Sequence, residues 1–136
     1  MYLEGPALER LQEHFQAIEE CLSHHAYDRA LEHYGKTLEF LQQQSENGVE
    51  DQKASLRNRR AELLMQLGRW DQALEDIDRT LAAEDVVGDG SLVVRALLQS
   101  AQISSYYGDY NEAISTLERA WGLAETRGQL ESHYVV

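Results

Sequence analysis

Hydrophobic residues recur along this chain at the spacing of an α-helix. Near the N-terminus, Leu8, Leu11, Phe15, Ile18 and Leu22 follow one another at steps of three or four positions, which places them on one helical face. Similar periodicity returns in five later segments. The pattern predicts an all-α fold with amphipathic helices over about residues 6–23, 27–43, 52–67, 70–83, 92–107 and 110–126.

These helices are expected to pair, because a short aromatic motif occurs three times. Trp70 stands two positions after Gly68, and its counterparts Tyr27 and Tyr110 lie 43 residues before it and 40 after it. A helical repeat of that length is typical of a solenoid of helix pairs. Turns of two or three residues require antiparallel partners. We therefore expect one domain over residues 1–136, with stacked hairpins over about 6–44, 51–84 and 91–127.

Several residues mark where the helices are expected to begin and end. Pro6 suits the first position of a helix, Gly68 suits a helix C-terminus, and Ser91 is expected to cap the fifth helix. Asn47-Gly48 predicts a loop. Residues 128–136 are predicted to begin a seventh helix that the sequence does not finish.

Composition restricts the partners and the cellular setting. The formal charge of −12 argues against nucleic acid, because phosphate binding needs a basic face. Cys21 is the single cysteine, so an intrachain disulfide is excluded and an intracellular, cytoplasmic setting is favoured. The N-terminal residues lack the features of a signal peptide, and no apolar run is long enough to cross a bilayer. No membrane partner is expected.

At fixed offsets from each turn, residues 8–127 resemble the tetratricopeptide repeat family. Small residues lie five positions after the turn, and large packing residues lie nine positions after it. The period is longer than the roughly 34 residues common in that family. The turn glycine is present as Gly68 and Gly108 but is replaced by His25. The small position is filled by Ala30, Ala73 and Ala113. The large position is filled by Tyr34, Ile77 and Leu117.

The resemblance implies a right-handed solenoid that serves as a protein-interaction module. In this family the first helix of each hairpin lines a concave groove that holds a partner peptide or helix. Amide side chains can hydrogen-bond a peptide backbone, and Arg can hold a carboxylate through two hydrogen bonds, so acidic groups on the partner are favoured. Mapped onto this chain, the groove face comprises Gln12, Phe15, Gln16, Glu19, Asn58, Arg59, Glu62, Gln66, Arg95, Leu98, Gln99, Gln102 and Tyr106, with Ser23 and Ser55 beside them.

The groove face has a simpler alternative, since a solvated helix surface would also be rich in Gln. One subset of the family clamps the C-terminal carboxylates of heat-shock chaperones. Of the corresponding positions here, only Arg95 keeps the charge, and Glu19 would repel a carboxylate. We predict that the chain does not bind such tails. The five positions are Phe15, Glu19, Arg59, Arg95 and Gln99.

Two clusters have competing interpretations. The basic cluster of Lys53, Arg57, Arg59 and Arg60 could receive an acidic peptide, or it could pair with acidic neighbours such as Glu75, Asp76 and Asp78. For Arg57 and Arg60 the second interpretation is favoured.

Trp70 and Trp121 are expected to pack between hairpins.

The second cluster is formed by His14, Cys21 and His25, whose helical spacing could suggest a metal or thiol site. A zinc site needs a fourth ligand, which is not evident, and a lone Cys usually packs as a small hydrophobe. We expect no metal and no cofactor. No catalytic arrangement of side chains stands out, so an enzyme is the least favoured function.

Two other functions remain open beside groove binding. The expected last hairpin has no completed capping helix, and the ends of solenoids need polar caps. Its end could therefore drive self-assembly as a homo-oligomer or docking into a larger complex. The chain could also be a regulatory sensor domain of a larger signalling protein.

Overall fold

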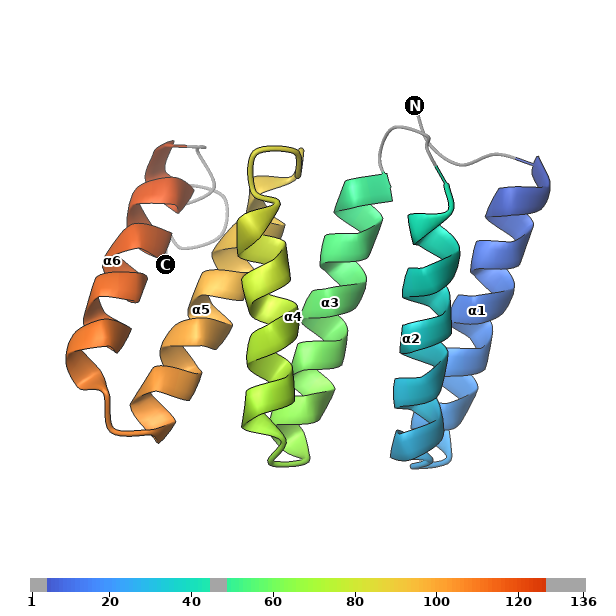
Figure 1. Cartoon of the computed structure of the whole chain (residues 1–136), viewed down its shortest axis with the longest axis horizontal. Helices are drawn as coiled ribbons and strands as arrows, with labels where there is room; N and C mark the ends of the chain where they lie inside the picture. The colour runs from blue at the N-terminus through green and yellow to red at the C-terminus, as the bar shows by residue number, and fades with distance from the viewer. Residues whose placement is uncertain (1–4, 45–48, 127–136) are drawn as a thin grey trace.

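The structure is a computed structural model that describes residues 5–44 and 49–126. Within these ranges the chain forms six α-helices, arranged in one row (Figure 1). The predicted all-α fold is confirmed. The expected Asn47-Gly48 loop and the seventh helix at 128–136 lie outside the described residues. The helices are α1 (Gly5–Ser23), α2 (Tyr27–Gln42), α3 (Val49–Gln66), α4 (Trp70–Ala82), α5 (Gly90–Tyr106) and α6 (Tyr110–Thr126).

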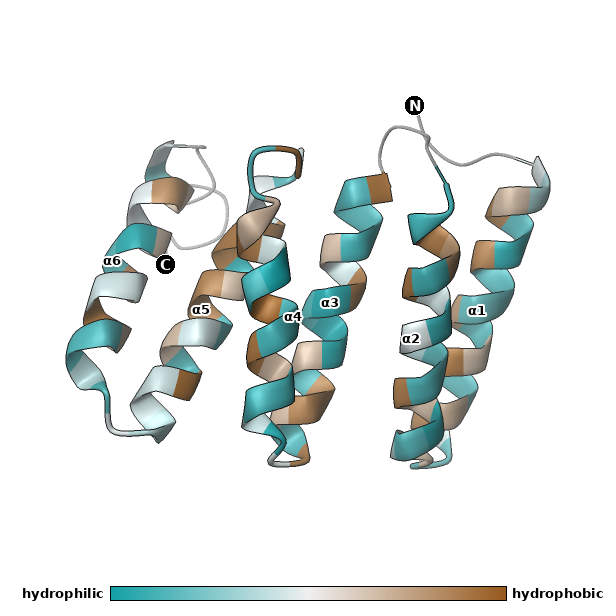
Figure 2. Ribbon diagram, viewed as in Figure 1, coloured by the Kyte–Doolittle hydropathy of each residue, from teal (hydrophilic) through white to brown (hydrophobic). Residues whose placement is uncertain are grey.

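Consecutive helices form three antiparallel hairpins that stack side by side. Within the hairpins α1 packs on α2, α3 on α4 and α5 on α6, and between hairpins α2 meets α3 while α5 meets both α3 and α4. The three short hairpin turns lie along the lower edge of the row, and the connection from α4 to α5 lies along its upper edge (Figure 1). Each helix carries both hydrophobic and hydrophilic residues along its length (Figure 2), as the stacking of amphipathic helices requires.

Each hairpin turn depends on one residue in the left-handed backbone region. Gly68 and Gly108 adopt φ values of 76° and 83°, and His25 adopts a φ of 59°. Glycine reaches this region freely, whereas a residue with a Cβ does so at a cost. His25 therefore departs from the other two turns in residue type but not in conformation. Its ring packs against Tyr27, with the ring centroids 5.8 Å apart.

Small residues let the paired helices approach closely, and larger residues fill the space beside them. The large side chains of Tyr34 and Ile77 are 2% and 0% exposed. Leu117, at the equivalent place on α6, is 45% exposed because none of the described helices packs over that side of α6. The alanines at the equivalent contact position are all buried: Ala30, Ala73 and Ala113.

A buried ion pair joins α3 to α4. Arg60 donates through Nε and Nη2 to the carboxylate of Asp76 over 2.7 and 2.6 Å, and Asp76 is only 2% exposed. This hydrogen bonding raises the pKa of Arg60. Arg57 is also buried, and that burial lowers its pKa. For Arg60, pairing with an acidic neighbour is thus confirmed over a role in receiving a peptide.

The cap of α5 differs from the sequence prediction. Asp89 is the N-cap residue, and its Oδ1 accepts hydrogen bonds from the backbone N–H and the hydroxyl of Ser91 at 3.0 and 2.7 Å. The predicted cap at Ser91 is therefore wrong by two positions. A carboxylate reaches the N–H two residues further along the chain, so the helix begins earlier than the apolar pattern suggests.

Candidate functional site

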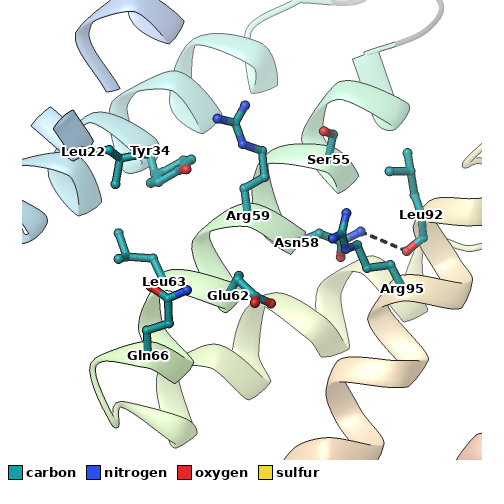
Figure 3. Close-up of a pocket in the computed structure, with 10 residues that line it drawn as sticks. All are labelled: Leu22, Tyr34, Ser55, Asn58, Arg59, Glu62, Leu63, Gln66, Leu92 and Arg95. Carbon is teal, nitrogen blue, oxygen red and sulfur yellow. Dashed lines mark hydrogen bonds between the residues drawn. The ribbon is translucent and has the colours of Figure 1, made fainter. Parts of the chain in front are cut away.

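A pocket of about 300 Å³ opens between the first hairpin, α3 and the start of α5, and we call it the groove pocket (Figure 3). Most of its lining comes from one face of α3, where side chains three or four positions apart lie next to each other. The lining residues are Leu22, Tyr34, Ser55, Asn58, Arg59, Glu62, Leu63, Gln66, Leu92 and Arg95.

The wall of the groove pocket near α1 carries an exposed ion pair. Arg59 Nη2 lies 2.9 Å from Glu19 Oε1, and the two side chains are 40% and 65% exposed. Pairs this open to water contribute roughly 0–1 kcal/mol to stability. Glu19 is therefore a weakly held partner, and another carboxylate can take its place on Arg59.

The pocket's lining is partly apolar. Tyr34 from α2 is buried, and this burial raises the pKa of its hydroxyl, although the nearby Arg59 acts in the opposite direction. Leu22 and Leu63 line the same region. An apolar side chain of a bound segment can pack here while Arg59 holds a polar group above it. Tyr34 packs between the helices, as the sequence predicts, and also borders the pocket.

The α5 side of the pocket carries a second arginine. Arg95 is exposed and makes no ion pair with another described residue. Figure 3 shows Arg59 on α3 and Arg95 on α5, with Arg95 beside Asn58. Two guanidinium groups on neighbouring hairpins can each hold a carboxylate in bidentate fashion.

Two amides expected on the groove face instead hold α3 and α5 together. Asn58 Nδ2 donates to the carbonyl of Leu92 at 3.0 Å, and Gln99 Nε2 donates to the carbonyl of Asn58 at 2.9 Å. Asn58 and Gln99 are only 3% and 4% exposed. Their N–H groups are already bonded, so Gln99 lies in the helix contact and Asn58 serves as a wall of the pocket. The periodicity could not show this, because it depends on the distance between two hairpins.

The remaining residues expected on the groove face are scattered. Gln12, Gln16 and Gln102 are exposed but do not line the groove pocket. Phe15 is half-buried and packs against the core of the first hairpin, so it is not a free anchor. Four residues line the groove pocket although the sequence did not predict them on the groove face: Leu22, Tyr34, Leu63 and Leu92.

The aromatic residues at the other end of the molecule divide between core and surface. Trp70 packs against the core, as predicted, and its ring stacks on Tyr106 with centroids 4.3 Å apart. Trp121 is 56% exposed, so its predicted packing between hairpins is wrong for the described residues. Leu98 lies beside Trp121 in a separate apolar pocket between α5 and α6.

The three residues that could have suggested a metal site are each engaged with other groups. His14 packs against Phe40, with ring centroids 5.6 Å apart, His25 packs against Tyr27, and Cys21 packs against the core of the first hairpin. Across residues 5–44 and 49–126, no group of three or more His, Cys, Asp or Glu side chains is placed to hold a metal ion. None of the described helices is long and apolar enough to span a bilayer.

Comparison with known families agrees with this architecture. The sequence model of the tetratricopeptide repeat matches residues 52–126, which is more than half of the chain. The chain belongs to the tetratricopeptide repeat family. Such repeats support a general role in protein–protein interaction. The first hairpin lies outside the matched tetratricopeptide region, and it is also the hairpin whose turn lacks the glycine.

A curated relative is also similar in sequence. The Hsp70-Hsp90 organizing protein of Triticum aestivum is 27% identical over 99 residues, which cover 69% of this chain and 16% of that protein. The chain thus corresponds to a small part of that relative's length. No solved structure matches the chain.

Proposed function

We propose that this chain is a non-catalytic adaptor that binds an extended or helical segment of a partner protein in the groove pocket. The observation that supports this best is that Arg59 and Arg95, from two successive hairpins, both line a pocket that is partly lined by apolar side chains. A rigid, preformed site of this kind binds a segment without paying for its own rearrangement. Leu22 and Leu92, which are half-buried and line the pocket, would supply the apolar contact.

The chemistry of the pocket favours a segment that carries a carboxylate. In the absence of a partner, Glu19 occupies Arg59 from across the groove. A carboxylate of the partner would displace Glu19 and gain a bidentate contact, and Arg95 could hold a second acidic group. The chain as a whole has a formal charge of −12, so this local pair of arginines is needed to overcome repulsion at longer range.

A peptide library displayed against the full chain tests this proposal. We expect enrichment of peptides that combine Asp or Glu with an apolar residue. The Arg59→Glu variant should lose about tenfold or more in affinity for the enriched peptides, because it removes one charge-assisted contact and adds repulsion.

Arg69→Glu provides the matched control. Arg69 forms an exposed pair with Asp28 at 3.0 Å, outside the groove pocket. Its reversal changes the net charge by the same amount as Arg59→Glu. Equal losses in the two variants, or enrichment of peptides without acidic residues, would count against the groove pocket as the binding site.

The relative's name links it to Hsp70 and Hsp90, and this raises the question of chaperone tails. We propose that the present chain does not bind them, because Phe15 packs into the core and Gln99 is buried between helices. These two positions would have to contribute polar contacts to a carboxylate clamp. Titration with a chaperone C-terminal peptide should show no saturable binding in the micromolar range, and such binding would refute this part of the proposal.

A further inference from the structure

The outer side of α6 exposes a row of large apolar side chains. Tyr110, Ile114, Leu117 and Trp121 are 64%, 55%, 45% and 56% exposed and follow one another at helical spacing. We call this row the α6 stripe. It adjoins an apolar pocket of about 180 Å³ between α5 and α6, to which Leu98 contributes. A continuous exposed apolar surface of this kind usually marks a binding site.

The earlier hairpins show what covers the same surface elsewhere in the chain. Tyr34 and Ile77, which are equivalent to Leu117, are both buried under the first helix of the following hairpin. In each case that helix presents apolar side chains seven positions apart. These are Leu56 and Leu63 of α3, in the core with Tyr34, and Ala96 and Ile103 of α5, in the core with Ile77.

The charge beside the α6 stripe defines the covering helix further. Glu118 is exposed at the edge of the stripe, and Gly35 is its equivalent on α2. Arg60 of α3 passes directly over that position, since its Nη1 would lie 3.8 Å from a Cβ placed on Gly35. A helix lying on α6 as α3 lies on α2 would bring a basic residue at the position of Arg60 against Glu118, with favourable charge pairing.

A second copy of this chain is a poor candidate for the covering helix. In α1, the positions equivalent to Leu56 and Leu63 are Glu13 and Glu20, and both are exposed. Stacking that face on the α6 stripe would bury unpaired carboxylates against apolar side chains, which is costly. The formal charge of −12 on each copy adds repulsion.

We propose that the α6 stripe binds an amphipathic helix of another protein, antiparallel to α6. That helix carries large apolar residues at positions i and i+7 and Lys or Arg at i+4, as Leu56, Leu63 and Arg60 do within α3. The site is separate from the groove pocket and favours a helix with one basic residue facing Glu118, whereas the groove pocket favours a segment with a carboxylate. The chain would thus bring two partners together.

A synthetic peptide of residues 49–66, the sequence of α3, is the probe. Fluorescence anisotropy of the labelled peptide with the full chain should show saturable binding. Glu118→Lys should weaken that binding about two- to fivefold, the range of an exposed ion pair. Glu112→Lys is the matched control. Glu112 is exposed on the side of α6 opposite the stripe, and its substitution changes the net charge by the same amount as Glu118→Lys.

A charge swap makes the contact specific. The peptide carrying Arg60→Glu should bind the Glu118→Lys chain more tightly than it binds the unaltered chain. Ile114→Glu in the chain should abolish binding of either peptide, while Arg59→Glu should leave it unchanged, which separates this site from the groove pocket. Four results would overturn the proposal: no binding to the full chain, equal losses for Glu118→Lys and Glu112→Lys, no recovery on swapping charges, or a concentration-dependent dimer of the chain without peptide in light scattering.

Discussion

His25 holds a backbone conformation that the two other hairpin turns assign to glycine. Its φ of 59° matches Gly68 and Gly108 closely enough that all three turns close in the same way. Holding a residue with a Cβ in this backbone region costs about 1–2 kcal/mol. The first turn therefore carries a local strain that the others lack, even though the short aromatic contact with Tyr27 offsets part of it.

Replacing His25 by glycine should stabilise the fold. We expect His25→Gly to raise the free energy of unfolding by about 0.5–1 kcal/mol, since relief of the strain exceeds the extra freedom gained by the unfolded chain. Urea unfolding followed by circular dichroism measures this. The reciprocal change, Gly68→Ala, meets no neighbouring atom within 4 Å and should destabilise through the backbone alone, by about 1–2 kcal/mol. A less stable His25→Gly variant would contradict the interpretation.

His14 provides a pH-dependent test at the same scale. Burial lowers the pKa of its imidazole below the ordinary 6.5, and nearby Arg10 adds to the effect. The unfolded chain then binds the proton more readily than the folded one, so stability falls as the pH drops through and below about 6.5. His14→Gln should lose less stability than the unaltered chain between about pH 7 and pH 5. Parallel stability profiles for the two proteins would show that His14 is not responsible.

Between elements, the pairing of α3 and α4 depends on one buried carboxylate. Asp76 is 2% exposed and accepts both hydrogen bonds from Arg60. Burial lowers the pKa of the nearby Arg57, and the charge of Asp76 acts in the opposite direction. A buried ion pair is weak evidence for net stabilisation, but removing one partner leaves an uncompensated charge inside the fold. The stability of the α3–α4 contact therefore depends on Arg60 and Asp76 being present together.

Removing that carboxylate should be strongly destabilising. We expect Asp76→Ala to cost about 3 kcal/mol in urea unfolding, whereas Asp78→Ala, two positions along and exposed, should change stability by less than about 0.5 kcal/mol. Replacing both partners, as Arg60→Met with Asp76→Leu, should recover part of the loss, because the Arg60 charge is removed together with its partner and only Arg57 keeps a buried charge. Similar small effects for the two Asp variants would mean that water compensates Arg60.

For the whole molecule, stability should be unevenly distributed along the row of hairpins. A solenoid is held by contacts between neighbouring repeats, so each helix is as stable as its covering allows. Among its described residues α6 buries only Ala113, Ala120 and Ala124, whereas α3 buries nine residues on several sides. The middle of the molecule is therefore the more firmly held part.

Hydrogen exchange measures this difference directly. Backbone amides of α3 and α4 should be the most protected, and amides of α6 should exchange faster by at least about tenfold, corresponding to 1.4 kcal/mol. Adding the residue 49–66 peptide should slow exchange in α6 more than in α1, if the α6 stripe is its site. Uniform protection across the helices would indicate that the described molecule unfolds as a single unit.

Much of this architecture was determined by the sequence alone. The periodicity of Leu11 and Ile18, the turn glycines and the recurring alanines are local signals, because a helix and its turns are stabilised by residues near in the chain. They were enough to predict six helices, their pairing and the family. They also brought Arg59, Glu62, Gln66 and Arg95 together on one side of the molecule, since spacing along a helix determines its faces.

The tertiary structure decided how those faces meet. Whether Gln99 points into a groove or bonds to Asn58 depends on the distance and rotation between two hairpins, which no local pattern specifies. The same holds for the pairing of Arg59 with Glu19, forty residues apart in the sequence, and for the exposure of Trp121. Side chains with helical spacing look alike in the sequence, and only the packing of one helix on another separates core, wall and open surface.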